Sequence, residues 1–248
     1  MIRNFITALQ FLTIFPVSRK HEITEANLAK SMAYFPLIGF ILGVFLIYVD
    51  KALSLAFPHT IANALLLIVF VLATRALHID GLADTLDAVM GGYDKESRLR
   101  IMKDSGVGTA GALGIVFVLL TKYLCLNDLP PLYKAEALLT VPMLSRWSHI
   151  LMAFRAKYGR DEGMGRAFVG HLRLSGVIAA SVMTILLTAW VSGLWTIYLV
   201  IGVALFTFLV RLYAVRMFGG VTGDVIGAVS EMNEVLILLL FVALSMGG

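Results

Sequence analysis

Three aspartates follow an apolar segment of this sequence at a spacing that could hold a metal ion. Asp80, Asp84 and Asp87 lie in the run from His78 to Asp87. On an α-helix, Asp84 lies about 40° and Asp87 about 20° from Asp80 around the axis, so the three carboxylates share one face. Like charges this close repel near a membrane unless a cation neutralises them. We therefore expect a metal site with Asp80, Asp84 and Asp87 as ligands, and Mg²⁺ holding substrate phosphates as the ion. A solvated acidic helix face is the alternative.

A second group of candidate residues opens the last apolar segment. Gly219, Gly220 and Gly223 precede Asp224, and Glu231 follows seven residues later on the same helix face. Glycines let a backbone approach a phosphate closely, and a helix start presents free N–H groups to it. We assign Gly220 and Gly223 to substrate binding and Asp224 and Glu231 to the metal. A glycine turn with Asp224 as the helix N-cap is the alternative.

Two basic, glycine-containing connections could bind phosphate. The first runs from Lys103 to Thr109 and offers Gly108 and Thr109 at a helix start, with Lys103 and Asp104 as candidate catalytic residues. The second contains Arg160, which could bind the anionic groups of a nucleotide. Its basic residues could equally serve only to set membrane topology.

Two further candidates lie in or beside apolar segments. Arg146 lies well inside one of them. A guanidinium in a bilayer is costly, so we expect it to face other helices and pair with Asp84, Asp87 or Glu231. His78 lies directly beside the acidic face and is a candidate base.

Membrane helices must position these residues. Of the 248 residues, 59% are apolar and only 15% are charged, and the mean hydropathy is +0.89. A soluble domain carries about 25% charged residues. The composition excludes a disordered chain, a coiled coil, a nucleic-acid-binding arm and a water-soluble fold, and the single Cys125 excludes an intramolecular disulfide. We predict one all-α domain over residues 1–248, a polytopic helical bundle whose partner is the lipid bilayer and not nucleic acid.

Seven apolar windows are long enough to cross a bilayer, which needs roughly 20 residues. A shorter amphipathic segment, Ile2–Val17, precedes them and is expected to lie in the membrane interface, or else to form a short buried helix. The seven windows are Tyr34–Leu53, Ile61–Leu77, Val107–Leu126, Ala137–Phe154, Ser175–Gly193, Trp195–Val215 and Val225–Met246.

The basic residues between these windows, or near the ends of them, are distributed unequally. Fifteen Lys and Arg fall in one set of connections, against Lys51, Lys122 and Lys134 in the other. Because cytoplasmic connections carry the excess of basic residues, we expect a cytoplasmic N-terminus and a multi-pass protein of the cell inner membrane. The candidate site residues gather in the basic connections, so the site is expected at the cytoplasmic face.

In order and spacing, these groups resemble the cobalamin synthase family, also called adenosylcobinamide-GDP ribazoletransferase, nearly from end to end. Lys103 stands where that pattern also has arginine, which keeps the charge but not a bidentate contact. The residues that carry the resemblance are Phe35–Gly39, His78–Thr85 with Asp87, Arg98, Ile101–Ser105, Gly108, Thr109, Ser145, Arg146, Tyr158, Arg160, Glu162, Gly163, Gly165, Phe168, Gly219, Gly220, Thr222–Asp224, Gly227, Ala228 and Glu231.

The resemblance implies a transferase that completes the nucleotide loop of a cobalamin. It would join adenosylcobinamide-GDP to α-ribazole, or to α-ribazole 5′-phosphate, and release GMP with Mg²⁺ as cofactor. In that reaction Asp84, Asp104, Lys103, Arg146 and His78 are the expected catalytic residues.

Two other functions fit the same composition. A CDP-alcohol phosphotransferase that makes phospholipid head groups also uses an aspartate-rich motif on membrane helices, but Asp84 follows Ala83 where that family needs arginine. An ion-coupled transporter would use intramembrane acids to bind its coupling cation. A transporter would move a solute without making a covalent product, which separates it from both enzymes.

Overall fold

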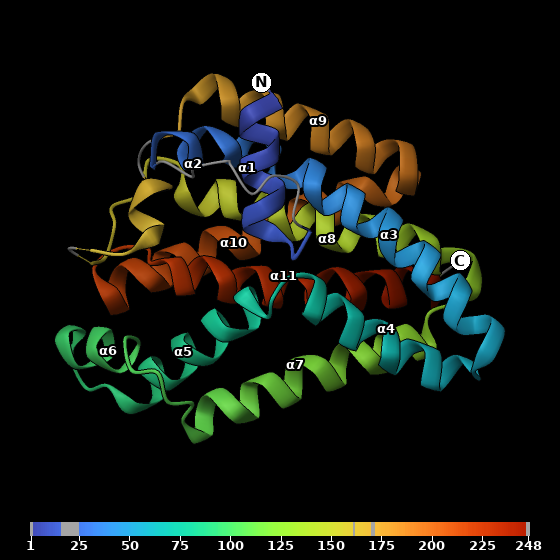
Figure 1. Cartoon of the computed structure of the whole chain (residues 1–248), viewed down its shortest axis with the longest axis horizontal. Coiled ribbons are helices and arrows are strands. Elements are labelled where there is room, and N and C mark those ends of the chain that lie inside the picture. The colour runs from blue at the N-terminus through green and yellow to red at the C-terminus, as the bar shows by residue number, and fades with distance from the viewer. Residues whose placement is uncertain (1, 16–24, 161, 170–171, 247–248) are drawn as a thin grey trace.

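The computed structural model describes residues 2–15, 25–160, 162–169 and 172–246. Within these ranges the chain forms helices without strands, and an isolated β-bridge joins Tyr158 to Val221. This confirms the predicted all-α bundle (Figure 1). The helices are α1 (Ile2–Leu12), α2 (Glu25–Ser31), η1 (Met32–Tyr34), α3 (Phe35–Ala56), α4 (His59–Ala73), α5 (Leu77–Gly91), α6 (Lys95–Ile101), α7 (Thr109–Asp128), α8 (Pro131–Ala153), η2 (Met164–Ala167), α9 (Leu174–Ser192), η3 (Gly193–Trp195), α10 (Thr196–Phe218) and α11 (Gly223–Met246).

Each of the seven predicted windows corresponds to a long helix, namely α3, α4 and α7 to α11. By length and composition, however, the described part of the chain has four stretches able to cross a membrane, or five if the bent pair α4–α5 counts as one. One of the four, Leu174–Phe218, contains both α9 and α10. These two helices run in opposite directions after Gly193 turns the chain at φ +53°.

Helix α11 lies in the middle of the bundle (Figure 1). On one side of it lie α8, α9, α10 and α3, and on the other lie α4, α5 and α7. Two-thirds of its most apolar stretch is buried, more than in the other candidate spans of the described chain. The last apolar segment of the sequence is therefore the core of the bundle rather than a peripheral span.

Small residues let α3 and α8 approach closely. Gly39 and Gly43 are four residues apart on one face of α3, and a Cβ at either position would collide with the α8 backbone near Pro142 and Leu138. This is the small-residue spacing that brings membrane helices together by van der Waals packing.

The chain breaks between α4 and α5, where the sequence predicted a direct continuation from the second window into the acidic segment. The two helices meet at 87°. Arg75 and Ala76 adopt left-handed conformations, with φ of 56° and 55°. The Thr74 hydroxyl donates to the Phe70 and Val71 carbonyls, and the Ile14 N–H donates to the Ala73 carbonyl. The break thus depends partly on a distant segment, and the local sequence lacks the glycine or proline that would announce it.

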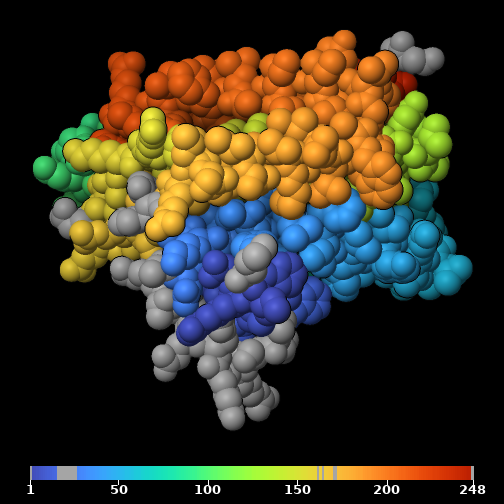
Figure 2. Space-filling model, turned by 90° about the horizontal axis from the view of Figure 1, so that it is seen from above, coloured from blue at the N-terminus to red at the C-terminus, as the bar shows by residue number. Residues whose placement is uncertain are grey.

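The outer surface is apolar where a bilayer would contact it. On α7, α9 and α10, side chains such as Phe117, Trp190 and Phe208 are more than half exposed. Helix α1 lies on the outside of the bundle beside α3, as Figure 2 shows, with Ala8 and Leu12 buried and Ile2 exposed. The amphipathic helix predicted at the N-terminus is therefore present as far as Leu12, and residues 16 and 17 of that prediction lie outside the described ranges.

Candidate active site

The predicted acidic groups meet where α5 crosses α11. A Cβ on Gly81 would lie 2.7 Å from the Asp224 carbonyl oxygen, and one on Gly227 would lie 3.2 Å from the His78 Cα. The crossing is antiparallel, because His78 faces Gly227 while Gly81 faces Asp224. Two glycines therefore let the backbones approach and bring the start of α11 against the first turns of α5.

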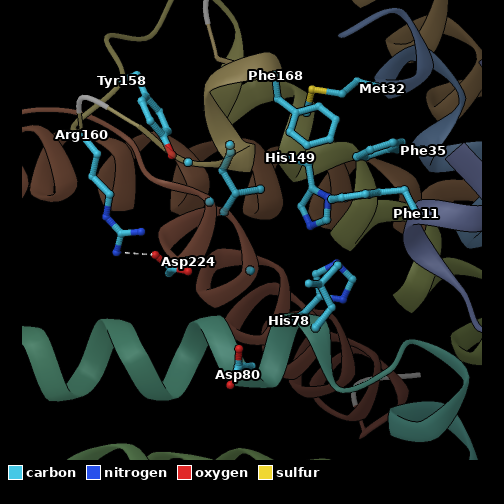
Figure 3. A pocket seen from close by; sticks show the side chains of 16 residues that line it. Phe11, Met32, Phe35, His78, Asp80, His149, Tyr158, Arg160, Phe168 and Asp224 are labelled. Atoms are coloured by element: carbon cyan, nitrogen blue, oxygen red, sulfur yellow. Dashed lines mark ion pairs between the residues drawn. The ribbon is translucent and has the colours of Figure 1, made fainter. Parts of the chain in front are cut away.

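This crossing gathers Asp80, Asp84 and Asp224 beside one arginine. Asp84 lies within electrostatic reach of Asp224, Asp80 and Arg160. The Arg160 Nη2 atom forms an ion pair of 2.7 Å with the Asp224 Oδ2 atom (Figure 3). The same atom donates a hydrogen bond to the Met102 carbonyl. Within the part of the chain that the structure describes, three carboxylates thus lie beside one guanidinium, which leaves negative charge for a further cation to neutralise.

A cavity of about 220 Å³ opens at this crossing. Asp80, Asp224, Arg160 and Tyr158 line one end of it, and Gly223 lines its wall at the start of α11. Burial raises the pKa of the Tyr158 phenol above its ordinary value, so the phenol stays protonated at neutral pH and can donate a hydrogen bond. The charged end can therefore offer donors and carboxylates to an anionic ligand.

The other end of the cavity is aromatic. Phe11, Phe35 and Phe168 meet there, with ring centroids 5.0 to 5.9 Å apart, and His149 packs edge-on against Phe35 at 5.8 Å. His78 lines the same end, 5.0 Å from His149 between ring centroids. The rings come from α1, α3, α5, α8 and the segment after η2. These segments lie far apart in the sequence, so this end of the cavity forms only when the helices pack together.

Next to His78, ionisable side chains of α7, α8 and α11 form a buried network. The Lys122 Nζ atom donates to Glu231 and to Glu234 at 2.5 Å each, and Arg146 pairs with Glu234. The Arg146 Nη2 atom also contacts the His78 Nδ1 atom at 3.3 Å. The expectation that Arg146 faces the bundle and pairs with an acid is confirmed, but the partner is Glu234, which lies opposite it on α11.

Glu231 does not join the acidic group at the crossing. Seven residues on a helix return to the same face but rise about 10 Å along the axis, so angular position alone does not bring two side chains together. Because α5 and α11 are antiparallel, Asp84 and Glu231 extend from the crossing in opposite directions. Glu231 instead neutralises Lys122, which the sequence had placed in an outer connection and which is buried inside α7.

Asp87 stabilises the start of α7. Its carboxylate accepts hydrogen bonds from the Gly108 N–H at 2.7 Å and the Gly111 N–H at 2.8 Å. The Gly108 N–H, which the sequence assigned to phosphate binding together with Thr109, is therefore bonded to a carboxylate of the protein itself. Neither Gly108 nor Thr109 lines the described cavity.

Asp84, although it lies beside Asp80 and Asp224, and three other predicted residues lie outside the cavity lining. Lys103 and Asp104 are exposed on the connection between α6 and α7, where Asp104 accepts a hydrogen bond from the Gly106 N–H. Gly220 packs against the 157–159 backbone, where a Cβ would lie 2.5 Å from the Lys157 carbonyl oxygen. This close contact between two connections explains why glycine is needed at position 220, whether or not a ligand also approaches it.

Among the residues that the structure describes, no three His, Cys, Asp or Glu side chains are arranged to hold a metal ion together. The predicted ligands therefore divide into Asp80, Asp84 and Asp224 near the cavity, Asp87 at the start of α7, and Glu231 in the buried network.

Sequence reasoning missed two members of the network and the aromatic end of the cavity. Lys122 and Glu234 are ionisable residues within apolar windows, which is a sufficient reason to suspect a buried pair. Phe11 could not have been found, because a single aromatic residue in an apolar helix carries no distinguishing pattern. Phe35 and Phe168 belong to the motifs that carry the family resemblance, but nothing in those motifs assigns them to a cavity.

Comparison with known proteins finds the same family that the motifs of the sequence resemble. The sequence model of the CobS family, described as cobalamin-5-phosphate synthase, matches residues 4–242. Proteins named adenosylcobinamide-GDP ribazoletransferase are similar over nearly their whole length. The relative from Geotalea daltonii is 40% identical over 98% of both chains, and that from Syntrophobacter fumaroxidans is 39% identical over 96% of this chain and 97% of its own. No solved structure matches the chain significantly. The match over almost every helix shows that the chain belongs to the cobalamin-5-phosphate synthase family.

Proposed function

We propose that this chain joins adenosylcobinamide-GDP to α-ribazole, or to α-ribazole 5′-phosphate, and releases GMP. Family membership and the names of its relatives support these substrates. The observation that carries the proposal is the cavity at the α5–α11 crossing, where Asp80, Asp224 and Arg160 lie at one end. Carboxylates and a guanidinium in one cavity are the groups that transfer of a phosphate-containing group requires.

In this reaction a hydroxyl oxygen of the acceptor bonds to the phosphorus next to cobinamide. The bond between that phosphorus and the GMP oxygen breaks, and GMP leaves with the electron pair. The hydroxyl proton passes to a carboxylate of the crossing or to water. Arg160 would hold a phosphate oxygen, and the Tyr158 phenol would donate to another. Arg146 is paired with Glu234, so it would position His78 beside the cavity and would not bind phosphate.

The donor set at the crossing fits Mg²⁺. Asp80, Asp84 and Asp224 offer oxygen ligands, and their charge exceeds that of Arg160. Mg²⁺ usually takes one or two carboxylates together with substrate phosphates, so it does not need three protein ligands arranged in advance. When bound, the ion would neutralise charge on the phosphate oxygens.

The proposed location is the cytoplasmic face of the inner membrane. Figure 1 places α6, the 155–160 connection and the start of α11 at the same end of the bundle. Lys95, Arg98 and Arg100 belong to α6, and Arg155, Lys157 and Arg160 belong to that connection. Anionic nucleotide substrates would meet positive charge there.

The direct test uses detergent-purified protein with adenosylcobinamide-GDP, α-ribazole and Mg²⁺. We expect a complete corrinoid, identified by mass, and one GMP for each. A well-folded preparation that forms neither product would contradict the proposal.

Asp84→Asn tests the role of the carboxylates at the crossing. We expect turnover to fall by about 100-fold or more and the Mg²⁺ concentration for half-maximal rate to rise, because an amide neutralises a cation poorly. Asp128→Asn, the same change at the exposed far end of α7, is the matched control. Near-normal turnover of Asp84→Asn with unchanged Mg²⁺ dependence would remove Asp84 from the site.

A further inference from the structure

The aromatic end of the cavity has no part in the phosphate chemistry proposed above. It is built from Phe11, Phe35 and Phe168 with His149 and His78, and in Figure 3 it lies at the opposite end from Arg160. Phe35 and Phe168 are almost fully buried. A wall of rings inside a cavity favours a flat aromatic ligand, because stacking adds to the gain from burying its faces.

The two histidines give this end its polar groups. His149 is 2% exposed, and its Nε2 atom has no hydrogen-bond partner among the described residues. A buried ring nitrogen without a partner costs stability, and a ligand atom in the cavity would remove that cost. His149 therefore points to a ligand independently of the aromatic wall.

Arg146 determines the tautomer of His78. A guanidinium only donates hydrogen bonds, so the His78 Nδ1 atom beside the Arg146 Nη2 atom must be the acceptor. The proton of the neutral ring then lies on Nε2. His78 is consequently a donor at Nε2 and not the base that its position beside the acidic face suggested.

We propose that this aromatic end binds the base of the acceptor nucleoside, a flat and largely apolar heterocycle with one unprotonated ring nitrogen. The inference rests on the proposed function and names the part of the substrate that the cavity selects. Phe11, Phe35 and Phe168 would contact the base, and the His149 Nε2 atom would donate a hydrogen bond to its free nitrogen. The benzimidazole of α-ribazole has this chemistry. Guanine would place an amide and an amino group against the phenylalanines without partners, which is costly.

The size of the cavity agrees with a nucleoside rather than a corrinoid. Pockets for complete drug-sized ligands are about 300–1,000 Å³, whereas this one is about 220 Å³. A base at the aromatic end would direct its sugar toward Asp80, Asp224 and Arg160. The reacting hydroxyl and the diphosphate would then meet at the charged end, while the corrinoid stays outside.

Phe168→Leu tests the aromatic contact. With adenosylcobinamide-GDP saturating, we expect the KM for α-ribazole to rise about tenfold, as loss of a stacking ring does elsewhere. The KM for adenosylcobinamide-GDP should stay within twofold. Phe241→Leu is the matched control, because Phe241 is equally buried but lies in the other apolar core. Thermal unfolding checks that both variants fold. Equal effects of the two variants, or parallel changes in both KM values, would overturn the proposal.

His149→Leu tests the hydrogen bond to the base with a readout that a packing role would not move. The wild type should prefer α-ribazole to the corresponding indole riboside, which has a C–H in place of the free ring nitrogen. In the His149→Leu variant, the ratio of kcat/KM for α-ribazole to kcat/KM for the indole riboside should fall to about twofold or less, whatever the overall activity of the variant. A preference kept in full would overturn the assignment of His149.

Equilibrium dialysis of α-ribazole separates failure of the inference from failure of the proposed function. If no acceptor is converted by the wild type, the proposed function fails, but binding still tests the aromatic end. Binding that Phe168→Leu weakens and Phe241→Leu does not would support the inference, and equal binding by all three proteins would overturn it.

Discussion

At the scale of single residues, charge inside the bundle decides which acids can reach a substrate. Lys122 and Arg146 neutralise Glu231 and Glu234, and all four side chains are buried. Their charges balance, so the network can persist in a low-dielectric interior. Among the described residues, Arg160 is the cation that lies beside Asp80, Asp84 and Asp224. The contrast separates carboxylates that hold helices together from carboxylates that remain available for a ligand.

Removal of one partner from the network should destabilise the protein. Lys122→Met leaves Glu231 and Glu234 with Arg146 as their remaining cation, so we expect a loss of about 3–5 kcal/mol in the free energy of unfolding. The double variant Lys122→Met, Glu231→Gln removes one charge of each sign and should recover part of that loss. Chemical unfolding in detergent measures both, and Lys51→Met at an exposed position is the control. Equal stability of Lys122→Met and Lys51→Met would show that the network contributes nothing.

At the scale of elements, the antiparallel crossing of α5 and α11 creates the site. Gly81 and Gly227 set how near the helices come, and the break between α4 and α5 lets α5 tilt across α11. The same crossing separates Asp84, which lies near the cavity, from Glu231, which lies in the buried network with Lys122. Helix geometry therefore assigns these carboxylates to different tasks.

Gly81→Ala should separate the two helices. Its Cβ would meet the Asp224 backbone at 2.7 Å, and overpacking of this kind costs about 1–3 kcal/mol. We expect a fall of at least about tenfold in transferase activity, because Asp80 and Asp224 move apart. Gly176→Ala, whose Cβ would make an ordinary contact of 3.8 Å with Ala33, should change activity less than twofold. Similar activity of the two variants would argue against the crossing as the determinant.

At the scale of the whole molecule, the bundle has one basic end and one nearly neutral end. Of the three lysines that the sequence assigned to the outer side, Lys122 is buried, which leaves Lys51 near the end of α3 and Lys134 near the start of α8. Lys134 pairs with Asp50 at 2.5 Å. The prediction of orientation therefore rests on a larger asymmetry than the sequence indicated.

Cysteine labelling checks this orientation. In a Cys125→Ser background, Ser54→Cys at the end of α3 should react with a membrane-impermeant maleimide in intact cells. Glu96→Cys on α6 should react only in inverted vesicles. Both parent residues are exposed. The reverse pattern would place the acidic cavity on the outer face.

The sequence by itself determined that the chain is a helical membrane protein, where its long helices lie, and that acids gather near α5 and the start of α11. Hydropathy and charge are local properties, so these conclusions needed no contacts. Only the tertiary structure decided which acids meet, because helical angle says nothing of axial height or of the neighbouring helix. In the folded chain Arg146 pairs with Glu234, and the Asp87 carboxylate accepts hydrogen bonds at the start of α7. The chain also breaks after Ala73, and Phe11, Phe35 and Phe168 come together. Each of these depends on residues far apart in sequence, whose meeting is set by how the helices pack.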